Sequence, residues 1–160
     1  MMLTLEHTNV LLKTVQIIQP LGVTWAITGS TSFCLQGMDV DVHDIDIQTD
    51  EKGAYHIGQA LSPFVVTPVA FSAVKTIRSH FGRFVMDDID IEVMGDIQKH
   101  VAGRWEDVVP LSPIIRHVSF GGVLVPVLDL RYEREAYYKM ERFDKAVLIQ
   151  KFLDCSVYPQ

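Results

Sequence analysis

Two acidic segments of the sequence have the residue types and spacing of a metal site. Asp44 and Asp46 alternate with isoleucines as Asp-Ile-Asp-Ile, and residues 88–92 repeat the pattern as Asp-Ile-Asp-Ile-Glu. Because side chains two positions apart in a strand project from the same face, each segment would present a row of carboxylates opposite an apolar row. Neighbouring negative charges repel, and a divalent cation between them removes the repulsion. Asp44 and Asp46 are therefore candidate ligands of Mg²⁺ or Mn²⁺, and a solvated strand face is the competing interpretation when this segment is taken alone.

The second acidic segment offers a third carboxylate, and two residues compete for that role. Glu92 and Asp90 would share one face of the expected strand. A carboxylate there could complete the metal site or accept the proton of an attacking hydroxyl group. Since the strand register is not fixed by the sequence, both residues remain candidates. A solvent-facing hairpin strand is the competing interpretation of this segment.

A Gly-Ser pair follows the apolar segment 23–28 and could bind an anion. A strand that runs into a helix leaves several backbone N–H groups unpaired, and Gly29 would let a phosphate approach the backbone closely. Ser30 could add a hydroxyl contact, and either Ser30 or Thr31 is expected to cap the helix. Such a pair is common at ordinary strand-to-helix turns, so its meaning depends on the two acidic segments.

Helices and strands intermix along the chain. Hydrophobic periodicity and turn residues predict helices over 4–19, after Ser30, over 51–61 and over 130–153, the last with a bend near Phe143. Strands are predicted over 23–28, 44–49, 65–70, 77–86, 89–94, 114–120 and 123–128. Pro68 would place its strand at a sheet edge, and Gly95-Asp96 would form a turn. We expect an α+β fold, with helices packed on a mixed β-sheet.

Composition and charge narrow the class of protein. The 160 residues fit one domain over 1–160, and 48% apolar with 21% charged residues is typical of a globular protein. The net charge of −6 argues against non-specific nucleic-acid binding but not against a nucleotide substrate, because bound magnesium can supply positive charge. No apolar run reaches membrane-spanning length and no secretory leader is evident, so no membrane partner and a cytoplasmic location are expected.

Together the motifs resemble the nucleotidyltransferase superfamily, whose fold is shared by DNA polymerase beta and kanamycin nucleotidyltransferase. The resemblance covers residues 23–94, in the expected order and strand context. It implies a nucleotidyltransferase-like core, here with an added hairpin and C-terminal helix. It also implies two-metal transfer of a nucleoside monophosphate from a nucleoside triphosphate to a hydroxyl acceptor on a small molecule, protein or RNA. The matching segments are Ile27-Thr28-Gly29-Ser30, Asp44-Ile45-Asp46-Ile47 and Ile91-Glu92-Val93.

The resemblance also assigns roles to individual residues. Gly29 and Ser30 would hold the triphosphate, and Asp44 with Asp46 would bind the metal ions. Glu92, or its rival on the same face, would be the third metal-binding carboxylate near the attacking hydroxyl.

Small bacterial members of the superfamily, including those of abortive-infection and toxin–antitoxin systems, have a helix after the sheet that offers a Lys and an Arg to the phosphates. Lys139 and Arg142 would take those places. A solvated basic helix face is the competing interpretation of this pair.

A second class of function stays open beside the enzyme. The chain has no room for the separate helical domain with which larger members bind the acceptor, so a homo-oligomer or a partner protein could complete the site. The fold could then serve as a non-catalytic or partner-dependent interaction module, for example in a toxin–antitoxin pair. Asp44, Asp46 and a third acid favour the enzyme, because a scaffold has no need to align carboxylates on a strand.

Overall fold

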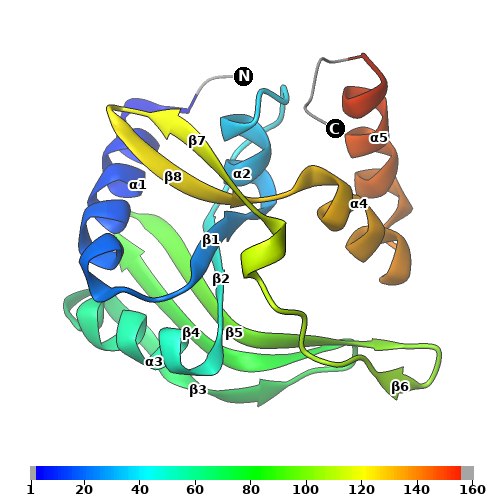
Figure 1. Ribbon diagram of the computed structural model, residues 1–160. Coiled ribbons are helices and arrows are strands. Elements are labelled where there is room, and N and C mark those ends of the chain that lie inside the picture. Colours follow the sequence, from blue (N-terminus) through cyan, green and yellow to red (C-terminus); the bar gives the residue numbers. More distant parts are fainter. Residues whose placement is uncertain (1–2, 156–160) are drawn as a thin grey trace.

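The computed structural model describes residues 3–155, and its centre is a mixed sheet of eight strands (Figure 1). Across the sheet the strands lie in the order β3 (Val65–Ala73), β4 (Ile77–Met86), β5 (Ile89–Val101), β2 (Ile45–Thr49), β1 (Trp25–Thr28), β8 (Val123–Leu128) and β7 (Ile115–Phe120), and β6 (Arg104–Trp105) pairs with β5. β2 is parallel to β5 and β1 is parallel to β8, whereas the other neighbours are antiparallel. This arrangement confirms the predicted α+β class.

Helices pack on both faces of the sheet. α1 (Leu5–Ile18) and α3 (Glu51–Ala60) cover one face and enclose the main core. On the other face, α4 (Leu130–Lys139) reaches the end of β1. α5 (Phe143–Cys155) packs beside α4 and against α2 (Gly29–Leu35). Short 3-10 turns lie at Gln19–Leu21, Ser62–Phe64 and Ser112–Ile114.

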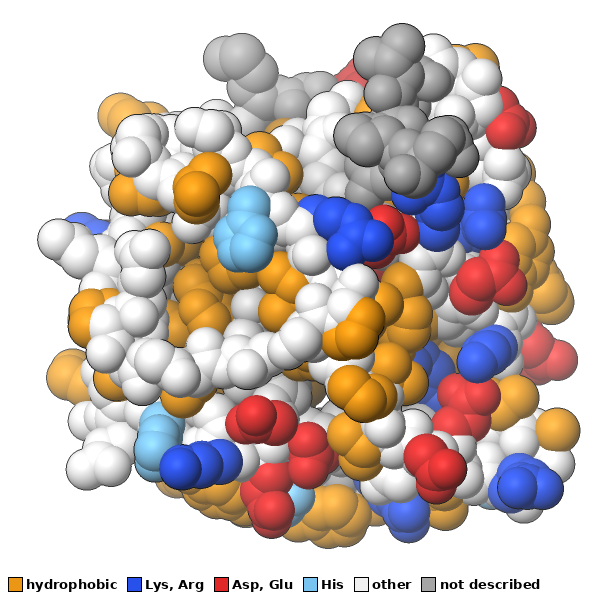
Figure 2. Space-filling model, in the orientation of Figure 1, with side chains coloured by type: hydrophobic (Ala, Val, Ile, Leu, Met, Phe, Trp, Pro, Cys, Tyr) orange, Lys and Arg blue, Asp and Glu red, His pale blue; other side chains and the backbone are white. Residues whose placement is uncertain are grey.

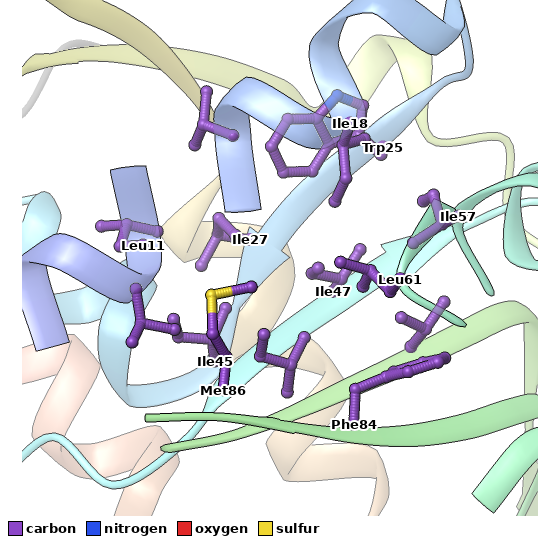
Figure 3. Packing of buried hydrophobic residues seen from close by; sticks show 14 of the residues in the cluster. Leu11, Ile18, Trp25, Ile27, Ile45, Ile47, Ile57, Leu61, Phe84 and Met86 are labelled. Atoms are coloured by element: carbon purple, nitrogen blue, oxygen red, sulfur yellow. The ribbon is translucent and has the colours of Figure 1, made fainter. Parts of the chain in front are cut away.

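The core determines which way the acidic side chains point. Ile45 and Ile47 of β2 are fully buried, as are Ile91 and Val93 of β5, and Figure 3 shows the two β2 isoleucines among the apolar side chains of the core. Burial of each isoleucine stabilises the fold by about 2 kcal/mol. Because side chains alternate along a strand, the residues between them must point to the opposite face. Core packing therefore directs the intervening acids away from α1 and α3.

The structure corrects one predicted boundary and makes another more definite. β5 continues to Val101, so Gly95-Asp96 forms no turn; the strand passes through an irregularity in its pairing with β4, where Asp96 has a φ of 50°. A Cβ atom at Gly95 would lie 2.6 Å from the backbone oxygen of Asp50, so glycine lets α3 approach the strand there. The predicted helix 130–153 divides into α4 and α5 close to the bend predicted near Phe143, and Glu141 between them has a φ of 60°.

The edge position of Pro68 is confirmed, because β3 is the outermost strand on its side of the sheet. The predicted cap of α2 is wrong. The helix begins at Gly29 with Thr28 at its N-cap, so Ser30 and Thr31 belong to its first turn. None of the described helices is both long and apolar enough to cross a membrane.

Candidate active site

Carboxylates from two strands meet on the face of the sheet that points away from α1 and α3. Asp46 of β2 and Glu92 of β5 are direct partners in the parallel pairing, and their side chains are hydrogen-bonded to each other. Thr28 of β1 is the partner of Asp46 on its other side. The β1–α2 turn and two acids thus occupy neighbouring positions on adjacent strands.

Burial and like charge shift the proton affinity of this pair. Burial raises the pKa of Asp46 to about 7, and the charges of Glu92 and Asp44 act in the same direction. The pKa of Glu92 is also raised, first by burial and then by Asp44 and Asp90, whereas Arg83 lowers it. Crowded carboxylates whose pKa values are raised mark a place where added positive charge would be favourable.

Asp44 lies immediately before β2 and acts electrostatically on both acids of the pair. Its backbone oxygen accepts a hydrogen bond of 2.6 Å from the hydroxyl of Thr31, which ties this position to α2. Asp90 is held differently. Its Oδ1 lies 2.7 Å from Nη2 of Arg83 and 3.1 Å from Nε of the same side chain. The structure therefore brings Asp44, Asp46 and Glu92 together and ties Asp90 to an arginine.

The Gly29 turn packs directly against Asp46. Gly29 has a φ of 71°, and a Cβ atom at this position would lie 2.7 Å from Oδ2 of Asp46. Both the backbone conformation and the close approach require glycine. The next residue, Ser30, accepts a hydrogen bond of 3.3 Å from the backbone N–H of His43. The predicted triphosphate-binding pair thus borders the carboxylates.

Sequence reasoning missed Glu133, a buried acid that contacts this turn from α4. Its Oε1 accepts hydrogen bonds from the hydroxyl of Thr28 and from the backbone N–H of Gly29, the latter at 3.2 Å. Burial raises the pKa of Glu133 to about 8. One signal was available, because Leu130 and Glu133 are three residues apart and share a helix face. A glutamate at a position expected to be apolar indicates a specific partner in the interior.

A third basic residue lies near the site beside the predicted pair, Lys139 and Arg142. Lys139 is exposed and its Nζ lies 3.0 Å from Oε2 of Glu106, while the guanidinium of Arg142 lies 5.4 Å from the ring centroid of Tyr137. Lys145, at the start of α5, lies 5.7 Å from the same ring centroid. Its charge lowers the pKa of Asp46 and of Glu133. Lys145 is therefore a cation that acts on the carboxylates, and sequence reasoning did not single it out.

A cavity of about 290 Å³ borders the site beside Ser30 and Lys145. Its other lining residues are Phe33, Asp39, Val40, Asp41, His43, Asp144 and Leu148. Over α4 and α5, Figure 2 shows blue Lys and Arg side chains mixed with red Asp and Glu side chains. The visible face therefore has no continuous basic surface of the kind that binds nucleic acid non-specifically.

Oxygen ligands suit a divalent cation here. Within residues 3–155, no three His, Cys, Asp or Glu side chains are already arranged to hold a metal ion. The donors that converge are nevertheless all carboxylates, which Mg²⁺ and Mn²⁺ prefer over nitrogen or sulfur. A cation would also relieve the repulsion that raises the pKa values of Asp46 and Glu92. The donor set therefore fits the group that the sequence motifs imply.

The sequence matches the model of the aminoglycoside-2''-adenylyltransferase family over residues 10–148. The chain belongs to this family. A solved structure of a proposed nucleotidyltransferase from Thermotoga maritima is 47% identical, with a TM-score of 0.84, and the match covers 96% of each chain. The predicted membership of the nucleotidyltransferase superfamily is confirmed, and the protein is a nucleotidyltransferase. Among curated proteins, none matches the sequence.

Two solved structures of low sequence identity share the fold. ANT(2'')-Ia, solved in complex with adenylyl-2''-tobramycin, is 9% identical with a TM-score of 0.57, covering 91% of this chain and 88% of that one. The lincosamide antibiotic adenylyltransferase LnuA, solved with lincomycin bound, is 12% identical with a TM-score of 0.56, covering 88% and 94%. At these identities the likeness shows a common fold alone.

Proposed function

We propose that the protein moves a nucleoside monophosphate from a nucleoside triphosphate to a hydroxyl acceptor and depends on Mg²⁺ or Mn²⁺ to do so. The observation that carries this proposal is the pairing of Asp46 with Glu92 beside the Gly29 turn. These acids come from strands that are distant in sequence, and Asp46 lies against Gly29, which is proposed to border the triphosphate. On a solvated strand face Asp46 would be exposed rather than half-buried, and its pKa would not be raised to about 7.

In this proposal Asp44, Asp46 and Glu92 hold the metal. A divalent cation bound there would supply positive charge to the phosphate oxygens as the bond to the leaving group breaks. Glu92 is favoured over Asp90 as the third carboxylate, because its side chain meets Asp46 while the other acid is paired with Arg83.

The protein's own groups orient the donor and the acceptor. Gly29 and Ser30 border the triphosphate, and the charge of Lys145 balances part of the negative charge of the phosphates. The acceptor oxygen bonds to the α-phosphorus, the bond from that phosphorus to the β-phosphate oxygen breaks, and pyrophosphate leaves. A carboxylate at Glu92 takes the proton of the acceptor hydroxyl.

Lys139 and Arg142 were predicted to contact the phosphates. We propose Lys145 in place of Lys139, because Lys139 is paired with Glu106 and Lys145 acts on Asp46, and we keep Arg142 as a candidate. The family description and the relatives with antibiotic ligands support a small hydroxyl-bearing molecule as acceptor and ATP as donor. Neither the comparisons nor the contacts within residues 3–155 favour the non-catalytic interaction module.

A radiolabel assay tests this function. The purified protein is incubated with α-labelled ATP, Mg²⁺ or Mn²⁺ and a panel of aminoglycosides and lincosamides, and labelled products are separated. Asp46→Asn should abolish transfer, since it removes a charged metal ligand with almost no change in shape. Asp88→Asn is the matched control, because it makes the same change at an exposed position four residues before Glu92. Equal transfer by wild type and Asp46→Asn would refute the mechanism.

A further inference from the structure

Glu133 is a buried acid with an unusual set of contacts. Its residue surface is 3% exposed, and it lies 105 positions from Thr28 in the sequence. Oε1 accepts hydrogen bonds from the hydroxyl of Thr28 and the backbone N–H of Gly29. Oε2 is also buried and has no hydrogen-bond partner among the described residues. A carboxyl group in such a position needs a reason, because burying a polar group without full satisfaction is unfavourable.

The backbone that Glu133 holds lies directly against Asp46. Thr28 is the register partner of Asp46, and a Cβ atom at Gly29 would stand 2.7 Å from Oδ2 of that acid. Two residues of backbone therefore separate Glu133 on one side from Asp46 on the other. A shift of this turn toward β2 would displace the Asp46 carboxylate, and a shift away would remove the backbone that packs against it.

The chemistry of a glutamate suits this contact. Oε1 accepts two hydrogen bonds at once, one from a side chain and one from the backbone, which an apolar residue could not do. Burial raises the pKa of Glu133 to about 8, and the charge of Asp46 acts in the same direction. Near neutral pH the group can thus accept both hydrogen bonds without bringing a full second negative charge behind Asp46.

We propose that Glu133 is a positioning residue that fixes the carboxylate of Asp46 through Thr28 and Gly29 and thereby sets the affinity of the site for a divalent cation. The proposal rests on the proposed function for its catalytic consequence. Its structural part concerns metal binding alone and can be measured without any transfer reaction. Groups that orient a metal ligand from behind typically change affinity or activity by about 10- to 100-fold when they are removed.

Four variants separate the hydrogen bonds from simple packing. Glu133→Leu fills the space but removes the acceptor, and Glu133→Gln keeps an acceptor oxygen. Thr28→Val removes the donor with little change in shape, and Thr28→Ser keeps it. Glu135→Leu is the matched control, because Glu135 is an exposed residue of the same helix.

The first measurement is the binding of Mn²⁺ alone to the full chain, followed by electron paramagnetic resonance. Glu133→Leu and Thr28→Val should weaken binding by about tenfold or more. Glu133→Gln and Thr28→Ser should restore most of the affinity, and Glu135→Leu should bind as wild type. Where transfer is measured, Glu133→Leu should lower kcat more than it changes KM for the acceptor. A backbone amide spectrum should show Gly29 N–H losing its protection from exchange.

A purely structural role gives a different pattern. If Glu133→Leu and Thr28→Val lower only the melting temperature and bind Mn²⁺ as wild type, the inference is overturned. Should Glu133→Leu fail to fold, Thr28→Val decides the question alone. A wild type that binds Mn²⁺ with the predicted variant pattern but transfers no nucleotide would sustain this inference and reject the proposed function. A wild type that binds no Mn²⁺ would overturn both.

Discussion

Asp90 and Glu92 lie two residues apart on one face of β5, yet the adjacent strands give them different neighbours. On β4, Arg83 is the register partner of Glu92, but its guanidinium reaches diagonally to Asp90 and approaches Oδ1 to 2.7 Å. Toward β2, Glu92 is hydrogen-bonded to Asp46, and its pKa is raised by burial and by neighbouring acids. The comparison teaches that an acidic row in the sequence is not one functional unit. The side chain that each acid contacts across the sheet decides whether it is neutralised or kept available for a cation.

The largest expected effect comes from neutralising each of the two acids in turn. Glu92→Gln should lower kcat by about 10²- to 10⁴-fold, because the variant loses both a metal ligand and the group that accepts the hydroxyl proton. Asp90→Asn should lower kcat by no more than a few fold. Steady-state transfer of labelled nucleotide measures both. A larger loss for Asp90→Asn would reverse the assignment and make Asp90 the third carboxylate.

The sequence predicted much of this arrangement and missed its long-range parts. The alternating isoleucines predicted that Asp46 and Glu92 each point to the polar face of their own strand, because local periodicity shows which side chains are buried. That β2 and β5 pair in parallel, with Asp46 opposite Glu92, depends on a crossover that no local pattern reveals. The extent of the domain, residues 1–160, stays a prediction.

Glu133 and Lys145 were not predicted, and the physical reason is the same for both: their contacts form only in the folded chain. Glu133 lies in a helix far along the chain and acquires its role only when α4 reaches the end of β1. Lys145 has no local sequence feature that sets it apart, whereas the family resemblance assigned the phosphate contact to Lys139 and Arg142. The pairing of Lys139 with Glu106 of the β6 segment joins residues 33 positions apart, which helical spacing could not anticipate.

A second test compares Lys145, now proposed to contact the phosphates, with Lys139, which was predicted to do so. Lys145→Met should raise KM for the nucleoside triphosphate by about tenfold, since the variant removes a charge that acts on Asp46, and a tenfold change equals about 1.4 kcal/mol. Lys139→Met should change KM by less than threefold, because this exposed side chain is engaged by Glu106. Initial rates over a range of ATP concentrations distinguish them. The reverse order would return the phosphate contact to Lys139, as first predicted.

The third test follows stability with pH in metal-free protein. An acid whose pKa is raised on folding binds more protons in the folded state, so the free energy of unfolding falls as pH rises from its unfolded pKa to its folded pKa. For Asp46, with a folded pKa of about 7, this window runs from roughly pH 4 to 7. Each such group contributes a slope of at most about 1.4 kcal/mol per pH unit.

Urea unfolding in the presence of a chelator measures that slope. Asp46→Asn should make it less steep between pH 5 and 7, whereas the contribution of Glu133, whose folded pKa is about 8, should continue up to about pH 8. Added Mn²⁺ should restore stability to the wild type at the upper end of the range, because the cation binds the ionised carboxylates. An unchanged slope in Asp46→Asn would show that the pair with Glu92 does not hold its proton in the folded state.

The smallest effect is expected where the acid is already paired. In Asp90→Asn the ion pair with Arg83 is lost, but the arginine is 40% exposed and the aspartate 34%, so water screens the interaction. The free energy of unfolding should fall by no more than about 1 kcal/mol, as is usual for exposed ion pairs. Arg83→Gln should behave alike in stability and also raise the pKa of Glu92, whose charged form Arg83 favours. The low-pH limb of the pH–activity profile of Arg83→Gln should therefore lie at a higher pH than that of wild type. If the pH profile is unmoved, Arg83 serves Asp90 alone and the two halves of the acidic row are independent.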